Sequence, residues 1–75
     1  MKTIKISLQM AQHVKEFVNI TQNYPFDILL KSGRYVVGAK SILGIFSLDL
    51  SQPITVEAYG DDFDDLFDKL KKFEV

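Results

Sequence analysis

The sequence contains one histidine, His13, the side chain best suited to acid–base or phosphoryl-transfer chemistry near neutral pH. A single histidine cannot form a histidine-based metal cluster, and a chain without cysteine has no disulfide, thiolate nucleophile or zinc–thiolate site. Helical arithmetic places His13 on the flank of the first predicted helix, near its start. Two interpretations remain open: a solvent-facing residue of the first helical turn, or a histidine that accepts a phosphoryl group.

Ser41 is the second candidate, because it directly precedes a short apolar segment with helical spacing. A serine at a helix start accepts a hydrogen bond from a free backbone amide, which is worth about 1 kcal/mol. The same position suits a phosphate, since the exposed amides and the helix dipole favour negative charge, and Lys40 stands beside it. Ser41 is therefore predicted to cap the helix and is a candidate for regulatory phosphorylation.

Four aspartates gather near the start of the last predicted helix, and carboxylates of this kind could hold a hard cation. The run lacks the alternating ligands, central glycine and closing glutamate of an EF-hand loop. Negative charge at a helix start stabilises the helix dipole, which explains the run without a metal. Phosphate-binding glycine motifs are also absent from the sequence. The four aspartates are Asp61, Asp62, Asp64 and Asp65. We therefore expect neither a metal ion nor a cofactor.

The elements that must position these residues follow from hydrophobic periodicity. Alternating apolar residues predict strands over residues 4–8, 26–31, 34–38 and 54–58, with a hairpin turn at Ser32-Gly33. Helical spacing predicts three helices, the second running from Ser41 to Leu48. The apolar stripe of the first helix is Met10, Val14, Phe17, Val18 and Thr21, and that of the last is Phe63, Leu66, Phe67, Leu70 and Phe73.

This β-α-β-β-α-β-α order predicts an α+β fold, an open-faced β-sandwich in which three helices cover one face of a four-stranded antiparallel sheet. A length of 75 residues predicts one domain, residues 1–75. The net charge of −1 argues against nucleic acid or an anionic membrane as a partner. No apolar run approaches the roughly 20 residues that span a bilayer, so a cytoplasmic protein is expected.

One segment carries a family resemblance. Lys40 to Leu48 reads K-S-I-L-G-I-F-S-L. It resembles the regulatory-serine segment, K-S-I-M-G-V-M-S-L, of the histidine-containing phosphocarrier protein (HPr) family of the bacterial sugar phosphotransferase system. The similarity extends over nearly the whole chain, and the predicted element order is that of the family. The resemblance implies a phosphoryl carrier, not an enzyme, that is phosphorylated on a histidine in an H-x-R-P pattern at the start of the first helix.

Two alignments locate that histidine differently. Without gaps from the serine segment, Met10 falls on the phosphohistidine, Gln12 on the arginine and His13 on the proline. The alternative places His13 on the phosphohistidine and deletes nearly one turn inside the first helix. We favour the first alignment, because deletions are tolerated more readily in the loop before a helix. Methionine cannot accept a phosphoryl group, so histidine phosphocarrier activity is expected to be absent.

The resulting hypothesis is a regulatory or protein-binding module that acts through the Ser41 helix. A divergent phosphocarrier that uses His13, and a purely structural interaction module, are the alternatives. The resemblance implies protein partners: components of the phosphotransferase system, a serine kinase or a transcriptional regulator. Ile42, Leu43, Ile45 and Phe46 offer more apolar surface than one face of a short helix buries. The predicted partner-binding residues are Gln12, Lys40, Ile42, Leu43 and Phe46.

Overall fold

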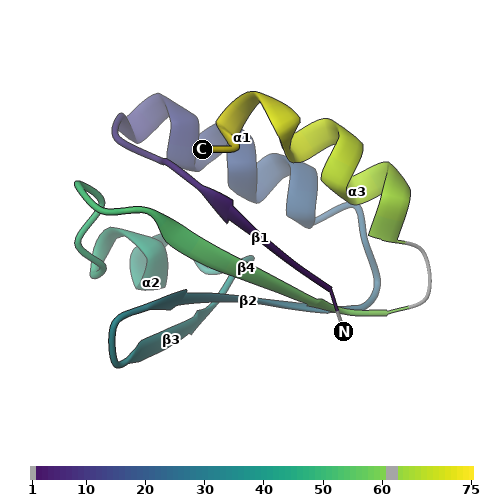
Figure 1. The fold of residues 1–75 in the computed structure, drawn as a ribbon, viewed down its shortest axis with the longest axis horizontal. Helices are drawn as coiled ribbons and strands as arrows, with labels where there is room; N and C mark the ends of the chain where they lie inside the picture. Colours follow the sequence, from purple (N-terminus) through teal and green to yellow (C-terminus); the bar gives the residue numbers. More distant parts are fainter. Residues whose placement is uncertain (1, 61–62) are drawn as a thin grey trace.

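The computed structural model describes residues 2–60 and 63–75, with the side chains of all of these except Phe63. The strands are β1 (Lys2–Ile6), β2 (Asp27–Ser32), β3 (Tyr35–Gly38) and β4 (Ile54–Tyr59). They form one antiparallel sheet in the order β1-β4-β2-β3. The described helices are α1 (Ala11–Thr21), α2 (Ile42–Phe46) and α3 (Phe63–Leu70), and a 3₁₀ turn, Lys71–Phe73, follows α3. The α+β open-faced sandwich predicted from the sequence is confirmed (Figure 1).

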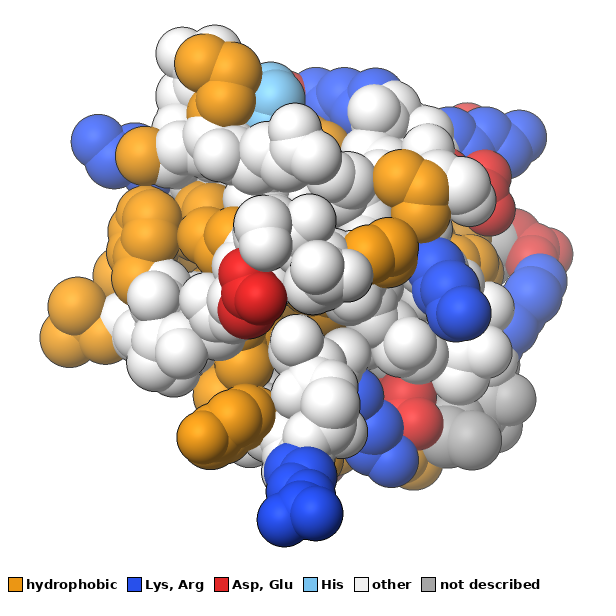
Figure 2. All heavy atoms as spheres, turned by 60° about the vertical axis from the view of Figure 1, so that its left-hand side comes forward, with side chains coloured by type: hydrophobic (Ala, Val, Ile, Leu, Met, Phe, Trp, Pro, Cys, Tyr) orange, Lys and Arg blue, Asp and Glu red, His pale blue; other side chains and the backbone are white. Residues whose placement is uncertain are grey.

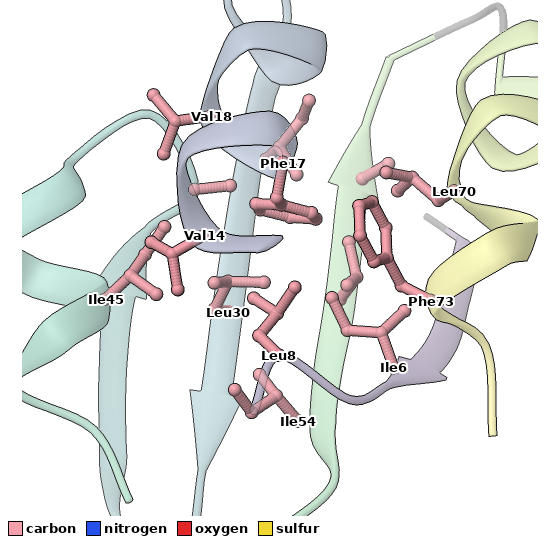
Figure 3. Close-up of a cluster of buried hydrophobic side chains, with 14 of the residues drawn as sticks. Ile6, Leu8, Val14, Phe17, Val18, Leu30, Ile45, Ile54, Leu70 and Phe73 are labelled. Carbon is pink, nitrogen blue, oxygen red and sulfur yellow. The ribbon is translucent and has the colours of Figure 1, made fainter. Parts of the chain in front are cut away.

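The hydrophobic core lies between the helices and one face of the sheet. Ile6, Ile54 and Leu30 project from three different strands into one core, to which α1 adds Phe17 and α3 adds Leu70, as Figure 3 shows. The register explains this arrangement, because side chains that alternate along paired strands meet on one face. The polar side chains that alternate with them therefore lie on the uncovered face.

The hairpin between β2 and β3 turns one residue later than the sequence suggested. Ser32 pairs with Tyr35, so the two-residue loop is Gly33-Arg34 and not Ser32-Gly33. Gly33 has a φ of 59°, which glycine adopts without steric cost, and Arg34 has a negative φ. This is the pattern of a type II′ turn, whose twist suits a hairpin.

Three further predictions need correction. Met10 is exposed and precedes α1, so it does not belong to the buried stripe of that helix. Leu48 is buried but lies after α2, which ends at Phe46. Leu8 is likewise buried beyond the end of β1. Asp61 and Asp62 lie outside the described residues, so the acidic run is placed only from Asp64 onward.

Candidate functional site

Met10 is the N-cap residue of α1. Its backbone is extended (φ −117°, ψ 145°), and its carbonyl oxygen accepts hydrogen bonds from the amides of His13 at 2.9 Å and Val14 at 3.2 Å. Its side chain is 52% exposed and makes no capping hydrogen bond. The amides of Ala11 and Gln12 precede the first intrahelical bonds, so they face outward from the helix start. Position 10 thus directly precedes the free amides at the start of α1.

His13 lies within the first turn of α1, as predicted, but it is half-buried and not simply solvent-facing. Its ring makes an edge contact with Phe73, with centroids 6.0 Å apart and planes at 61°. Both residues line a shallow hollow of about 400 Å³. Lys72 also lines this hollow, and its ammonium group is paired with Glu16 of α1. Among the described residues, Lys72 is the only lysine or arginine that lines the hollow, and its charge is already paired with Glu16.

Ser41 caps α2, as predicted from its position. Its Oγ accepts a hydrogen bond from the amide of Gly44 at 3.2 Å, while its own amide donates to Gly38 at 3.1 Å. A Cβ atom at position 44 would lie 3.1 Å from that Oγ, so glycine leaves room around the hydroxyl. Ser41 is exposed at the start of α2.

Lys40 does not direct its charge toward Ser41. Its Nζ donates to the carbonyl oxygens of Tyr24 at 2.6 Å and Phe26 at 3.3 Å. These carbonyls belong to the loop between α1 and β2, where backbone acceptors would otherwise rely on water. Lys40 therefore joins the loop between α1 and β2 to the segment that leads into α2.

Helix α2 runs back along α1. The residue before Lys40, Ala39, is hydrogen-bonded to Thr21 at the end of α1, whereas Ile45 lies beside Val14 near its start (Figure 3). The end of α2 and the start of α1 consequently meet at one end of the molecule. This brings Phe46, which is 42% exposed, to the same end as Met10.

The apolar side chains of α2 divide between core and surface. Ile45 is fully buried and Ile42 is half-buried, whereas Leu43 is 81% exposed. Figure 2, a view of the side that carries α2 and the start of α1, shows hydrophobic side chains exposed at several points. Five residues define what we call the docking surface: Met10, Gln12, Ile42, Leu43 and Phe46.

A polar cluster on the uncovered face of the sheet was missed by sequence reasoning. Glu57 of β4 is buried there. Its carboxylate accepts a hydrogen bond from the Tyr59 hydroxyl at 2.6 Å and forms an ion pair with the Lys31 ammonium at 3.0 Å. These partners hold the pKa of Glu57 below its ordinary value. The carboxylate in turn raises the pKa values of Lys31 and Tyr59. The alternation that placed Glu57 outward could not show that its neighbours cover it.

The described aspartates of the acidic run have structural partners. Asp65 accepts a hydrogen bond from the Tyr24 hydroxyl at 2.6 Å and pairs with Lys69, and Asp64 pairs with Lys2. Elsewhere, the hydroxyl of Ser51 and then its amide donate to Asp49 and lower the pKa of that carboxyl. Residues 2–60 and 63–75 contain no group of three side chains able to hold a metal, and no helix among them could cross a membrane.

A four-stranded antiparallel sheet covered by three helices in this order is the HPr fold. The chain matches the family model described as PTS HPr component phosphorylation site over residues 3–74. It therefore belongs to the HPr family of the phosphotransferase system. No curated protein gives a significant match to the sequence.

Solved structures of HPr proteins are similar to this one. HPr-C-His from Thermoanaerobacter tengcongensis is 29% identical with a TM-score of 0.82, and the match covers 96% of this chain and 89% of that one. HPr from Bacillus anthracis is 28% identical with a TM-score of 0.79, covering 99% and 94%. Crh, a catabolite repression protein of Bacillus subtilis described as an intertwined, domain-swapped dimer, is 26% identical with a TM-score of 0.67, covering 96% and 88%.

Proposed function

We propose that this chain is a regulatory, protein-binding member of the HPr family that does not carry a phosphoryl group on histidine. The observation that carries the proposal is Met10 at the N-cap of α1, the position that directly precedes the free amides of the helix start. A thioether has no exchangeable proton and forms no phosphoryl ester or amidate. Gln12 and His13 then stand where the H-x-R-P pattern has arginine and proline, so a phosphate would find no guanidinium there.

A phosphocarrier that uses His13 is the alternative. One observation favours it: the ring lines a hollow that is open to solvent and has Lys72 in its wall. A phosphoryl group on His13 would have to compete with Glu16 for the Lys72 ammonium. The amide of His13 already donates to Met10, so it is not free to bind the phosphate. These two contacts weigh against the alternative.

The docking surface supports binding of a protein partner. Leu43 and Phe46 remain exposed although their helix packs on α1. A partner that covers such apolar side chains removes them from water, which favours binding. We assign this surface to components of the phosphotransferase system, a serine kinase or a transcriptional regulator. Lys40 borders the surface, with its charge held by the loop carbonyls. The similarity to Crh, a catabolite repression protein, supports a regulatory role.

Leu43→Glu tests the docking surface, because a side chain this exposed contributes little to folding. The probe is the purified phosphoenolpyruvate-dependent kinase of the phosphotransferase system, titrated into labelled protein and followed by NMR. We expect Leu43→Glu to weaken binding at least about tenfold by placing a charge in the apolar contact. Val36→Glu, at an exposed position on β3, is the matched control and should bind normally. Equal affinity for wild type and Leu43→Glu would contradict this surface.

Phosphorylation of Ser41 is the regulatory part of the proposal. A phosphate there would add negative charge at the start of α2, where the Gly44 amide points at the side chain. Incubation with the serine kinase of the phosphotransferase system and ATP should label wild type but not Ser41→Ala, with an authentic HPr as positive control. An unlabelled wild type beside a labelled control would remove this part and favour the purely structural module.

A further inference from the structure

The two edges of the sheet are protected to different degrees. At β1, the amide of Ser7 donates to Phe73 at 2.8 Å and the amide of Val75 donates to Lys5 at 3.2 Å, so the last residues pair along the strand end. Lys2 and Lys5 add charge to the same strand. Lysines and covering segments are the means by which proteins keep an edge strand from pairing with another chain. The β1 edge is thus closed to self-association over much of its length.

The β3 edge has free hydrogen-bonding groups. The amide of Ala39, just after β3, donates to Ile28 at 2.9 Å and so points toward β2. The direction of the backbone N–H and C=O groups alternates along a strand. Those of Val37 and Tyr35 therefore also point toward β2, while those of Val36 and Gly38 point outward. The Gly38 carbonyl accepts from the Ser41 amide. The amide and carbonyl of Val36 and the amide of Gly38 therefore remain on the outer edge.

The side chains of β3 carry no charge that would keep another strand away. The strand reads Tyr-Val-Val-Gly, rich in residues that favour β-structure. Tyr35 is 69% exposed and Val36 is 52% exposed, on opposite faces of the sheet. Figure 1 shows β3 as the border strand opposite β1. Apolar side chains and free backbone groups coincide at this one edge.

We propose that β3 pairs with β3 of a second copy of this chain, antiparallel about a two-fold axis, to form a continuous eight-stranded sheet. This inference is independent of the docking surface and of phosphorylation. With the axis at Val36, its amide and carbonyl bond reciprocally to Val36 of the second copy, and Tyr35 lies opposite Val37. Within Tyr35–Gly38 the pairing brings no like charges together, and it places Arg34 opposite Gly38, whereas β1 against itself would place lysines near lysines.

The structure limits the strength of this dimer. β3 has only four residues, so the pairing covers a small area and belongs to the weak class of interfaces. We therefore expect monomers at low micromolar concentration and dimers as the concentration approaches the millimolar range. The amides of Val36 and Gly38 should become protected from hydrogen exchange with rising concentration, while those of Tyr35 and Val37 are protected throughout.

Sedimentation equilibrium across this concentration range tests the pairing. Val36→Pro removes the outward amide and leaves the amides of Tyr35 and Val37 in place, and proline is tolerated at a strand edge whose N–H faces solvent. Val36→Lys keeps the backbone and places two cations at the axis, so the test survives if the proline variant fails to fold. Each should weaken association at least about tenfold, because every change acts twice in a symmetric dimer. Leu43→Lys, on the docking surface, is the matched control and should associate as wild type does.

Dimerisation of wild type and Leu43→Lys, together with monomeric Val36 variants, supports the proposal. A wild type that stays monomeric at every concentration overturns it, as does a dimer that persists in both Val36 variants. Association lost only in Leu43→Lys would assign self-contact to the docking surface and would equally overturn the β3 pairing.

Discussion

The hydroxyl of Thr21, buried at the end of α1, donates a hydrogen bond to the carbonyl oxygen of Ala39 at 3.0 Å. The same hydroxyl lies 3.0 Å from the carbonyl of Val18, one turn back in α1. Ala39 is two residues before Ser41, so this buried contact fixes the start of α2 relative to α1. A residue that no functional motif contains thus helps to position the candidate regulatory serine.

Replacing Thr21 with valine should test this link, because valine matches threonine in shape but has no hydroxyl. The buried Ala39 carbonyl would lose its partner, which costs about 1–3 kcal/mol of unfolding free energy. Chemical denaturation measures the loss. Thr21→Ser retains the hydroxyl and should keep the exchange protection of α2, whereas Thr21→Val should lower it. Unchanged stability in Thr21→Val would show that the hydrogen bond is unimportant.

Ser41 should contribute to stability even without modification. Ser41→Ala removes the acceptor for the Gly44 amide and should lower the unfolding free energy by about 1 kcal/mol. Ser41→Asp keeps an acceptor at the N-cap and adds charge favourable to the helix dipole, so it should be close to wild type. Thermal or urea denaturation of the three proteins gives the comparison. Equal losses for alanine and aspartate would contradict a capping role.

Stability should fall in acid because of Glu57. The Tyr59 hydroxyl and the Lys31 ammonium stabilise its ionised form, so its pKa is lower in the folded than in the unfolded chain. A carboxyl whose pKa is lowered by folding contributes its full stabilisation at a pH above its pKa in the unfolded chain, about 4.3. This stabilisation is lost as the pH falls through the pKa of the folded chain.

Urea denaturation between neutral pH and pH 3 measures this dependence. Glu57→Gln cannot ionise and should show a shallower loss of stability in acid than wild type. Parallel pH profiles for the two proteins would mean that Glu57 is not the group responsible. At the alkaline end, the raised pKa values of Lys31 and Tyr59 predict that their contribution to stability is lost as the pH rises through those values.

Much of the fold could be predicted because periodicity reports burial directly. Val14, Phe17 and Val18 recur at helical spacing and are buried, and Ile54 and Val56 alternate as an inward-facing strand should. The errors fall at element ends. Met10 has the spacing of the α1 stripe, but it is the N-cap, where the extended backbone points its side chain elsewhere. Periodicity cannot show where the helical backbone begins.

The candidate site was only partly predictable. The cap at Ser41 follows from local sequence, since its partner is three residues away. The contact of His13 with Phe73 and the hydrogen bonds of Lys40 join residues far apart in the chain, so no local pattern encodes them. The chemical type of each side chain was evident from the sequence, but the group that it contacts was not.

We propose that this HPr-family chain has no histidine phosphoacceptor, because methionine occupies the start of α1. Phosphoryl transfer from phosphoenolpyruvate, through the kinase of the phosphotransferase system, tests it most directly, with an authentic HPr as positive control. We expect no acid-labile phosphate on wild type and its appearance in Met10→His, which places an acceptor at the N-cap. Acid-labile phosphate on wild type that disappears in His13→Ala would show instead that His13 is the phosphoacceptor.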